Sequence, residues 1–252
     1  MPKILVTGCS SGFGLAIARI FLASGWEVVA TMRNPQASPL PETDNLQVVA
    51  LDVTDADSIA QAVEAAGPID ALVNNAGVGL LNVLEGTEMS KVRELFETNL
   101  FGAIAMTKAV LPQMRQRGAG VIVNVSSSVT LAPFPALSVY SASKAALNAL
   151  TESLAVEAAL FGVRACLVLP GSAPTTSFGK NAVARMGLDV PEPYSAFVYD
   201  YLAKLRSATE VTTADDVADA VWRAVTDKNA PMMIAAGADA QALFQGAGRN
   251  AA

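Results

Sequence analysis

Tyr140 and Lys144 are the pair in this sequence whose side chains and spacing could do acid–base chemistry. They lie four positions apart in a proline-free stretch of mostly good helix formers, so a helix would place both on one face. A phenol titrates near ~10, and an adjacent ammonium favours its ionised form. We therefore expect a lowered pKa at Tyr140, which would let the phenol exchange a proton near neutral pH. Most Tyr-x-x-x-Lys pairs in proteins are simply surface neighbours, so the pair alone does not indicate catalysis. The rest of the chain must also supply a cofactor site and a second hydroxyl.

A glycine-rich turn near the N-terminus could bind the phosphates of a cofactor. Residues 3–7 are predicted to form a buried strand, Gly8, Gly12 and Gly14 follow, and residues 15–22 are predicted to form a helix. In this context the glycines let the backbone approach a pyrophosphate, and the helix N-terminus offers N–H groups and a partial positive charge. The spacing is Gly-x-x-x-Gly-x-Gly and not the commoner Gly-x-Gly-x-x-Gly, so an ordinary glycine turn is the alternative.

Arg33 bears on the choice of dinucleotide. A second strand is predicted at residues 27–31, and NAD-specific sites usually place an acid after this strand to bind the ribose 2′-hydroxyl. This chain has no acid there, and Arg33 could instead form charge-assisted hydrogen bonds with a 2′-phosphate. The sequence therefore favours NADP(H) over NAD(H), and the alternative is a solvated loop arginine.

Polar or glycine-containing motifs follow the predicted strands at their carboxyl ends. Further strands are predicted at residues 46–51, 70–73, 120–125, 163–169 and 232–235, with helices between most of them. This alternation predicts an α/β fold, a single doubly wound parallel sheet with helices on both faces, spanning residues 1–252 as one dinucleotide-binding domain. Ligands bind outside the carboxyl ends of the strands in such sheets. We therefore expect these motifs to form one site.

Two segments have more than one interpretation. Asn99 lies among apolar residues in a helical stretch predicted at 90–117, and it is either a satisfied core polar group or part of a site. Residues 172–210 contain prolines, glycines and several aromatic residues. They form either a lid with an apolar inner face over the substrate or a surface insertion whose aromatic side chains pack on the core.

Composition excludes several classes of function. Of the 252 residues, 52% are hydrophobic and 16% charged, which allows a large core, and the net charge of −6 argues against a nucleic-acid groove. The absence of histidine excludes histidine triads and histidine-ligated zinc. Cys9 and Cys166 lack metal-binding spacing and are expected to be small apolar residues in a reducing, cytoplasmic setting. We expect no signal peptide, no membrane span and no metal site.

The motifs, taken in order, resemble those of the short-chain dehydrogenase/reductase family over nearly the whole chain. They are Thr7-Gly8-x-x-x-Gly12-x-Gly14, Asn74-Asn75-Ala76-Gly77, Asn99, Ser127, Tyr140-x-x-x-Lys144 and Pro170-Gly171. In that family the active serine lies about a dozen residues before the tyrosine, so the resemblance favours Ser127, 13 positions before Tyr140, over Ser126 and Ser128. The resemblance implies a Rossmann-type fold, and the stretch 30–33 looks like that of NADP-preferring steroid and retinol dehydrogenases.

The resemblance also implies roles for four catalytic residues. Tyr140 would donate the proton in reduction and accept it in oxidation. Lys144 would lower the pKa of Tyr140 and bind the nicotinamide ribose. Ser127 would hydrogen-bond the substrate oxygen, and Asn99 would hold a water in a proton relay.

The cofactor-binding residues follow from the same resemblance. Asp52 would receive the adenine amino group, residues 75–77 would border the adenosine ribose, and Thr175 would meet the carboxamide. The segment after Gly171 departs from the aliphatic pattern of the family, so the choice between Thr175 and Thr176 stays open. The expected cofactor-binding set is Gly8, Ser10, Ser11, Gly12, Phe13, Gly14, Arg33, Asp52, Val53, Asn75, Ala76, Gly77, Tyr140, Lys144, Pro170, Gly171, Ala173 and Thr175.

The sequence therefore predicts an oxidoreductase that transfers hydride between NADP(H) and a hydrophobic ketone or secondary alcohol, with Tyr140 as general acid and base. The apolar, aromatic segment 172–210 favours the hydrophobic substrate. A non-catalytic dinucleotide-binding redox sensor is the main alternative, and isomerase or dehydratase chemistry is a third. The resemblance further implies a homodimer or homotetramer formed through the helices predicted at 90–117 and 138–161.

Overall fold

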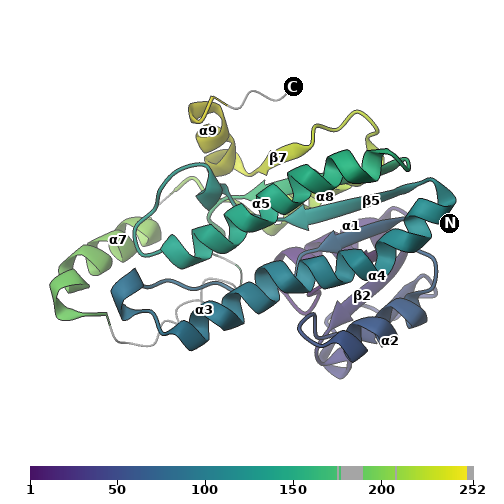
Figure 1. Cartoon of the computed structure of the whole chain (residues 1–252), viewed down its shortest axis with the longest axis horizontal. Coiled ribbons are helices and arrows are strands. Elements are labelled where there is room, and N and C mark those ends of the chain that lie inside the picture. Colours follow the sequence, from purple (N-terminus) through teal and green to yellow (C-terminus); the bar gives the residue numbers. More distant parts are fainter. Residues whose placement is uncertain (175, 177–189, 208, 249–252) are drawn as a thin grey trace.

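The computed structural model describes residues 1–174, 176, 190–207 and 209–248 (Figure 1). The described residues form one seven-stranded sheet in the order β3-β2-β1-β4-β5-β6-β7, and every neighbouring pair is parallel. The strands are β1 (Lys3–Val6), β2 (Glu27–Met32), β3 (Leu46–Ala50), β4 (Ala71–Asn74), β5 (Gly120–Val125), β6 (Val163–Pro170) and β7 (Met233–Ala236). The predicted doubly wound sheet is confirmed. Its strand order reverses between β1 and β4, which is where such sheets bind ligands.

Helices cover both faces of the sheet. They are α1 (Gly12–Ala23), α2 (Ala56–Ala66), α3 (Met89–Phe96), α4 (Gly102–Arg117), α5 (Ser138–Ala159), α7 (Ser195–Ser207), α8 (Ala214–Thr226) and α9 (Ala238–Gly246). Alternate residues of β1 point to opposite faces, so Ile4 packs with α1 and α8 while Leu5 packs with α2, α4 and α5. Figure 1 shows the second group of helices on the near face of the sheet. The two apolar layers therefore hold the strand ends in a fixed frame.

The helix expected at 90–117 is interrupted near its middle. A π-helical turn, Glu97–Phe101, joins α3 to α4 and places Asn99 in a buried position. Such turns insert an extra residue into the helical repeat and are frequent at functional sites. The sequence predicted the helical stretch but not this interruption, because the pattern of apolar residues continues through it.

The N-terminal ends of α1 and α8 also lie near the site. Helix α1 begins at Gly12, three residues earlier than predicted, so the last two glycines of the turn belong to its first turn. Helix α8 begins with a capping box in which Thr213 and Asp216 exchange hydrogen bonds.

The part of 172–210 that the structure describes includes a short 3-10 turn, Glu192–Tyr194, followed by α7. Thr175 and residues 177–189 lie outside the described residues. Val198 of α7 is buried against Leu81 and Val83, whereas Phe197 and Tyr199 are exposed. The inner face of this helix is therefore apolar, with Tyr201 and Leu202 packing beside Val198, and two of its aromatic residues face solvent. Within the described ranges, no helix combines the length and apolar character needed to cross a membrane.

Candidate active site

The turn between β1 and α1 has the properties of a phosphate-binding site. The first N–H groups of a helix lack acceptors within it, and the side chain of Ser11 at the N-cap does not satisfy them. Gly8 and Gly12 adopt positive φ values of 77° and 57°. A Cβ at Gly14 would lie 2.2 Å from the carbonyl oxygen of Gly8, so only glycine fits there. The turn thus leaves N–H groups for an anion and little room for side chains.

Asn75 ties this turn to the end of β4. Its Nδ2 donates to the carbonyl oxygens of Thr7 (2.8 Å) and Gly8 (3.2 Å). The hydroxyl of Thr7 in turn accepts from the backbone N–H groups of Asn75 (3.0 Å) and Ala76 (2.9 Å). The side chain of Asn75 is therefore used to brace the turn, and the expected ribose-bordering segment 75–77 lies directly beside it.

Arg33 and Asp52 lie near each other at the ends of β2 and β3. Asp52 accepts from the N–H (2.9 Å) and hydroxyl (2.7 Å) of Thr54, and these bonds lower the pKa of its carboxyl, with a smaller contribution from the charge of Arg33. The side chain of Arg33 is exposed. The structure thus places an exposed guanidinium and an ionised carboxylate where the adenosine end of a dinucleotide is expected.

Ser127 lies just beyond β5 and caps a short 3-10 helix, Ser128–Thr130. Its Oγ accepts from the N–H of Val129 at 3.3 Å, which gives a local structural reason for a serine at this position. The same side chain also hydrogen-bonds Tyr140 across the site. Ser127, the expected member of the three consecutive serines, is thus joined to Tyr140 by a hydrogen bond.

Tyr140 and Lys144 are buried on α5, with 7% and 5% of their surfaces exposed. Lys144 Nζ donates to the carbonyl oxygen of Val125 at 3.0 Å. Burial raises the pKa of Tyr140, an effect that the hydrogen bond with Ser127 offsets only in part, and it lowers the pKa of Lys144 to about 8. The expected lowering of the Tyr140 pKa is not found, because low-dielectric surroundings penalise the phenolate more than its neighbours stabilise it. Tyr140 is thus a protonated acid at neutral pH.

Asn99 completes the cluster from the π-helical turn. Its Oδ1 accepts from the N–H of Val78 (2.8 Å), and its Nδ2 donates to the carbonyl of Val78 (3.0 Å) and to Ser143 Oγ (3.2 Å). A Cβ added at Gly77 would lie 3.3 Å from Asn99 Oδ1 and 3.6 Å from Lys144 Nζ. The segment after β4, the π-helical turn and α5 therefore meet around Gly77.

The end of β6 is held by residues that the sequence analysis did not select. Gly171 N donates to Thr212 Oγ1 (2.9 Å), and Ser172 N donates to Asp239 Oδ2 (2.6 Å). Thr212 Oγ1 also lies 2.7 Å from Asp239 Oδ1. The expected site residues Pro170 and Gly171 are thus fixed in place. No local pattern identifies Thr212 and Asp239, because Thr212 lies just before α8 and Asp239 in α9, both far from Gly171 in the sequence.

Asn148 is a second residue that the sequence analysis passed over. It lies one turn beyond Lys144 on α5, is 7% exposed, and hydrogen-bonds Ser126 and Thr130 on either side of Ser127. The four-residue spacing that relates Tyr140 to Lys144 could have identified it, had it been extended by one more turn.

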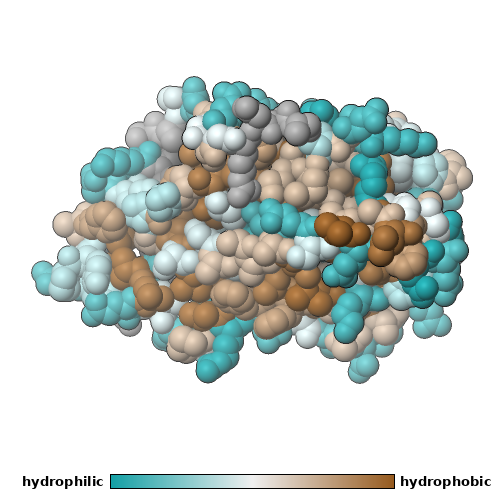
Figure 2. All heavy atoms as spheres, turned by 45° about the horizontal axis from the view of Figure 1, so that its top comes forward, coloured by the Kyte–Doolittle hydropathy of each residue, from teal (hydrophilic) through white to brown (hydrophobic). Residues whose placement is uncertain are grey.

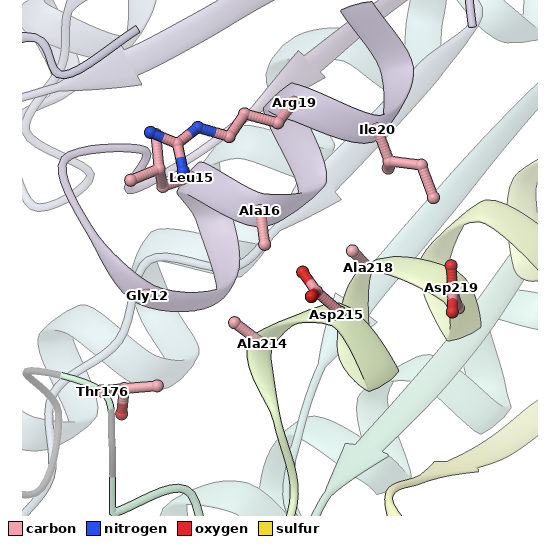
Figure 3. Close-up of a pocket in the computed structure, with 10 residues that line it drawn as sticks. All are labelled: Gly12, Leu15, Ala16, Arg19, Ile20, Thr176, Ala214, Asp215, Ala218 and Asp219. Atoms are coloured by element: carbon pink, nitrogen blue, oxygen red, sulfur yellow. The ribbon is translucent and has the colours of Figure 1, made fainter. Parts of the chain in front are cut away.

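A cavity of about 510 Å³ lies between α1 and α8 (Figure 3). It shares Gly12 with the glycine turn and Thr176 with the segment after β6, but its lining includes no member of the Ser127–Tyr140–Lys144–Asn99 cluster. Asp215 and Asp219 line it together with Arg19, so its charged lining is net negative and disfavours a phosphate. Among the described residues, no group of three His, Cys, Asp or Glu side chains could hold a metal ion.

The chain matches known proteins over most of its length. A family model described as short chain dehydrogenase matches residues 2–185. The "Uncharacterized oxidoreductase YusZ" of Bacillus subtilis is 40% identical over 241 residues, which cover 89% of this chain and 85% of that protein. Retinol dehydrogenase 8 of Bos taurus is 42% identical over 190 residues, or 70% of this chain and 61% of the bovine protein.

Solved structures agree with these sequence matches. A short-chain dehydrogenase from Streptomyces avermitilis is 38% identical, with a TM-score of 0.84 over 97% of this chain and 91% of that one. A short chain dehydrogenase from Burkholderia cenocepacia in complex with NADP is 27% identical, with a TM-score of 0.79 over 99% and 93%. A 3-ketoacyl-(acyl-carrier-protein) reductase from Brucella melitensis complexed with NADH is 26% identical, with a TM-score of 0.76 over 93% and 96%. This protein therefore belongs to the short-chain dehydrogenase/reductase family and is an oxidoreductase acting on CH–OH groups.

Proposed function

We propose that this protein transfers hydride between NADP(H) and a hydrophobic ketone or secondary alcohol, with Tyr140 as general acid and base. The observation that carries this proposal is the meeting of Ser127, Tyr140, Lys144 and Asn99 at the carboxyl ends of β4 and β5. Two hydroxyls and one ammonium share this space, and the glycine turn is tied to it through Asn75. We also treat residues 1–252 as one functional domain, since one sheet carries all of these groups.

The chemistry divides between the cofactor and the chain. A bound nicotinamide supplies or takes up the hydride. In reduction, Ser127 and Tyr140 donate hydrogen bonds to the substrate oxygen as it gains negative charge. Tyr140 then gives its proton to that oxygen, and the ammonium of Lys144 stabilises the phenolate that remains. We further propose that Asn99, whose amide is bonded to Val78 and Ser143, holds the water of the proton relay.

The residues that would hold the cofactor extend along the switch point of the sheet. The N–H groups at the start of α1 would bind the diphosphate, and Lys144 the nicotinamide ribose. Arg33 supports NADP(H) over NAD(H), because it is exposed at the end of β2 and no acid takes the usual ribose-binding position. Solved relatives hold either NADP or NADH, so Arg33 is the basis of this preference.

Apolar side chains around Tyr140 support a hydrophobic substrate. Tyr140 packs in a cluster with Leu80, Leu95 and Val139. A neighbouring cluster joins Leu81, Val83 and Ala136 to Val198 of α7, and Leu137 packs against both clusters. A substrate that approaches the phenol from this side would meet apolar surface, which favours an apolar ketone or alcohol. The likeness to a retinol dehydrogenase is consistent with this class.

We further propose that the chain forms a homodimer or homotetramer through α4 and α5. Val156, Leu160 and Phe161 near the end of α5 are exposed, and Arg115 of α4 lies over the ring of Phe161 at 5.7 Å. Figure 2 shows hydrophobic side chains across the face that these helices form. Leu160→Asp should therefore lower the mass measured by light scattering after size-exclusion chromatography.

The two cysteines are free and buried, which supports a reducing, cytoplasmic location.

The central test is Tyr140→Phe, assayed by NADPH absorbance against a panel of hydrophobic ketones. We expect turnover to fall by about 10²–10⁴-fold, the usual contribution of a positioned acid, with NADPH affinity largely retained. Tyr199→Phe is the matched control, because Tyr199 is exposed and belongs to α7. Near-normal turnover by Tyr140→Phe would rule out the proposed mechanism.

A further inference from the structure

A row of three polar side chains runs along the buried face of α5. Tyr140, Lys144 and Asn148 follow one another at intervals of four residues, and all three are buried. The first two belong to the proposed chemistry. The hydrogen bonds of Asn148 go to Ser126 and Thr130 and not to Ser127 or Tyr140, which would hold the substrate oxygen. Because Asn148 is buried, both the oxygen and the nitrogen of its amide need partners.

The amide of Asn148 joins two hydroxyls. Ser126 Oγ donates to Asn148 Oδ1 at 2.5 Å, and Asn148 Nδ2 donates to Thr130 Oγ1 at 3.0 Å. Thr130 Oγ1 then donates its single hydrogen to the carbonyl oxygen of Ser127 at 2.9 Å. A carbonyl oxygen cannot donate, so Thr130 must be the donor in this last bond and can only accept from Asn148. The nitrogen of the Asn148 amide, and not its oxygen, must therefore face Thr130.

These contacts fix the backbone on both sides of Ser127. Ser126, the residue before it, is also held to β6 through its N–H, which donates to Val168 O at 2.8 Å. Thr130 closes the turn after it. Among the described residues, the Ser127 hydroxyl contacts Tyr140 and accepts a long bond from the N–H of Val129, at 3.3 Å. Its direction is therefore set by the backbone that Asn148 holds.

We propose that Asn148, acting through Ser126 and Thr130, is a positioning residue that aims the Ser127 hydroxyl at the substrate oxygen. The inference rests on the proposed function, since it assigns that role to Ser127. One helix face thus carries the acid, the cation and the group that orients the second hydrogen-bond donor. Their spacing of four residues, slightly more than one helical turn, keeps all three on one face of α5.

Asn148→Asp is the sharpest perturbation, because it keeps the shape of the side chain but removes its donor. The hydroxyl of Thr130 would then turn toward the carboxylate and release the Ser127 carbonyl. Thr130→Val removes the same hydroxyl from the other side at nearly constant volume. Thr130→Ser keeps it and serves as the conservative control.

The experiment measures kcat with the best ketone from the NADPH screen, NADPH affinity by fluorescence titration, and hydrogen exchange of the 129–131 amides in the cofactor-free protein. For Asn148→Asp and Thr130→Val we expect kcat to fall at least tenfold and these amides to exchange at least tenfold faster. NADPH affinity should stay within twofold of wild type in both variants. Thr130→Ser, which keeps the hydroxyl, should retain near-normal kcat. A residue needed only for folding would instead lower the melting temperature without this division between kcat and cofactor affinity.

Parallel variants separate failure of this inference from failure of the proposed function. If Ser127→Ala and Tyr140→Phe abolish turnover while Asn148→Asp and Thr130→Val do not change kcat, the positioning role is wrong and the function stands. If Ser127→Ala and Tyr140→Phe remain active, the proposed function fails and the inference fails with it. If Asn148→Asp does not fold, Thr130→Val and Thr130→Ser decide the question alone.

Discussion

Lys144→Met should stabilise the cofactor-free protein while abolishing its turnover. Burial lowers the pKa of Lys144 from 10.5 to about 8. A tenfold change in proton affinity corresponds to about 1.4 kcal/mol, so holding this charge in the folded protein costs about 3 kcal/mol at pH 7. The substitution also removes the hydrogen bond to Val125 O, which is worth about 1 kcal/mol. The net gain is about 2 kcal/mol, or about 4–8 °C in Tm for a chain of this size.

The pH dependence tests the origin of this gain. Because the folded pKa of Lys144 is lowered, the unfolded chain binds the proton more tightly between about pH 8 and 10.5. The stability contributed by this group therefore rises with pH across that window, and the advantage of Lys144→Met should nearly vanish by pH 10. The turnover loss follows separately, because the phenolate of Tyr140 loses its cation.

The assay compares thermal unfolding of wild type and Lys144→Met at pH 7 and pH 10 without dinucleotide. Lys108→Met on α4 is the control, since Lys108 is exposed and should give a change within about 0.5 kcal/mol. A variant less stable than wild type at pH 7, or a gain of equal size at both pH values, would refute the burial argument.

Three further substitutions test other parts of the site. Arg33→Ala should weaken NADPH binding about 10–100-fold, because it removes charge-assisted hydrogen bonds to the 2′-phosphate, and should change NADH binding little. Equal losses of affinity for NADPH and NADH in fluorescence titrations would exclude that role. Gly14→Ala places a Cβ 2.2 Å from Gly8 O. It should raise the Kd for NADPH about tenfold or more, since the turn must shift, whereas Gly246→Ala, with no atom within 4 Å, should not. Asp239→Ala leaves the N–H of Ser172 without its acceptor and should cost about 3 kcal/mol in urea unfolding. The exposed Asp219→Ala is its control, and equal stability of the two variants would contradict the bracing role.

The sequence by itself determined the architecture and the positions of the main motifs. Alternating strand and helix patterns specify a parallel sheet, and in such a sheet every polar segment that follows a strand reaches the same edge. Ser127 could be chosen among three serines because the resemblance to the family sets its distance from Tyr140, and a hydrogen bond between the two side chains is present in the fold. These features are local or follow from topology, so one-dimensional patterns carry them.

Only the tertiary structure decided how the site is charged and braced. The sign of the Tyr140 pKa shift depends on how much water the folded chain removes, and burial outweighs the neighbouring groups that a sequence can name. The π-helical turn at Asn99 and the first turn of α1 at Gly12 depend on packing against other segments. The contacts of Asn148 and Asp239 join residues from different elements, so they exist only once the chain has folded.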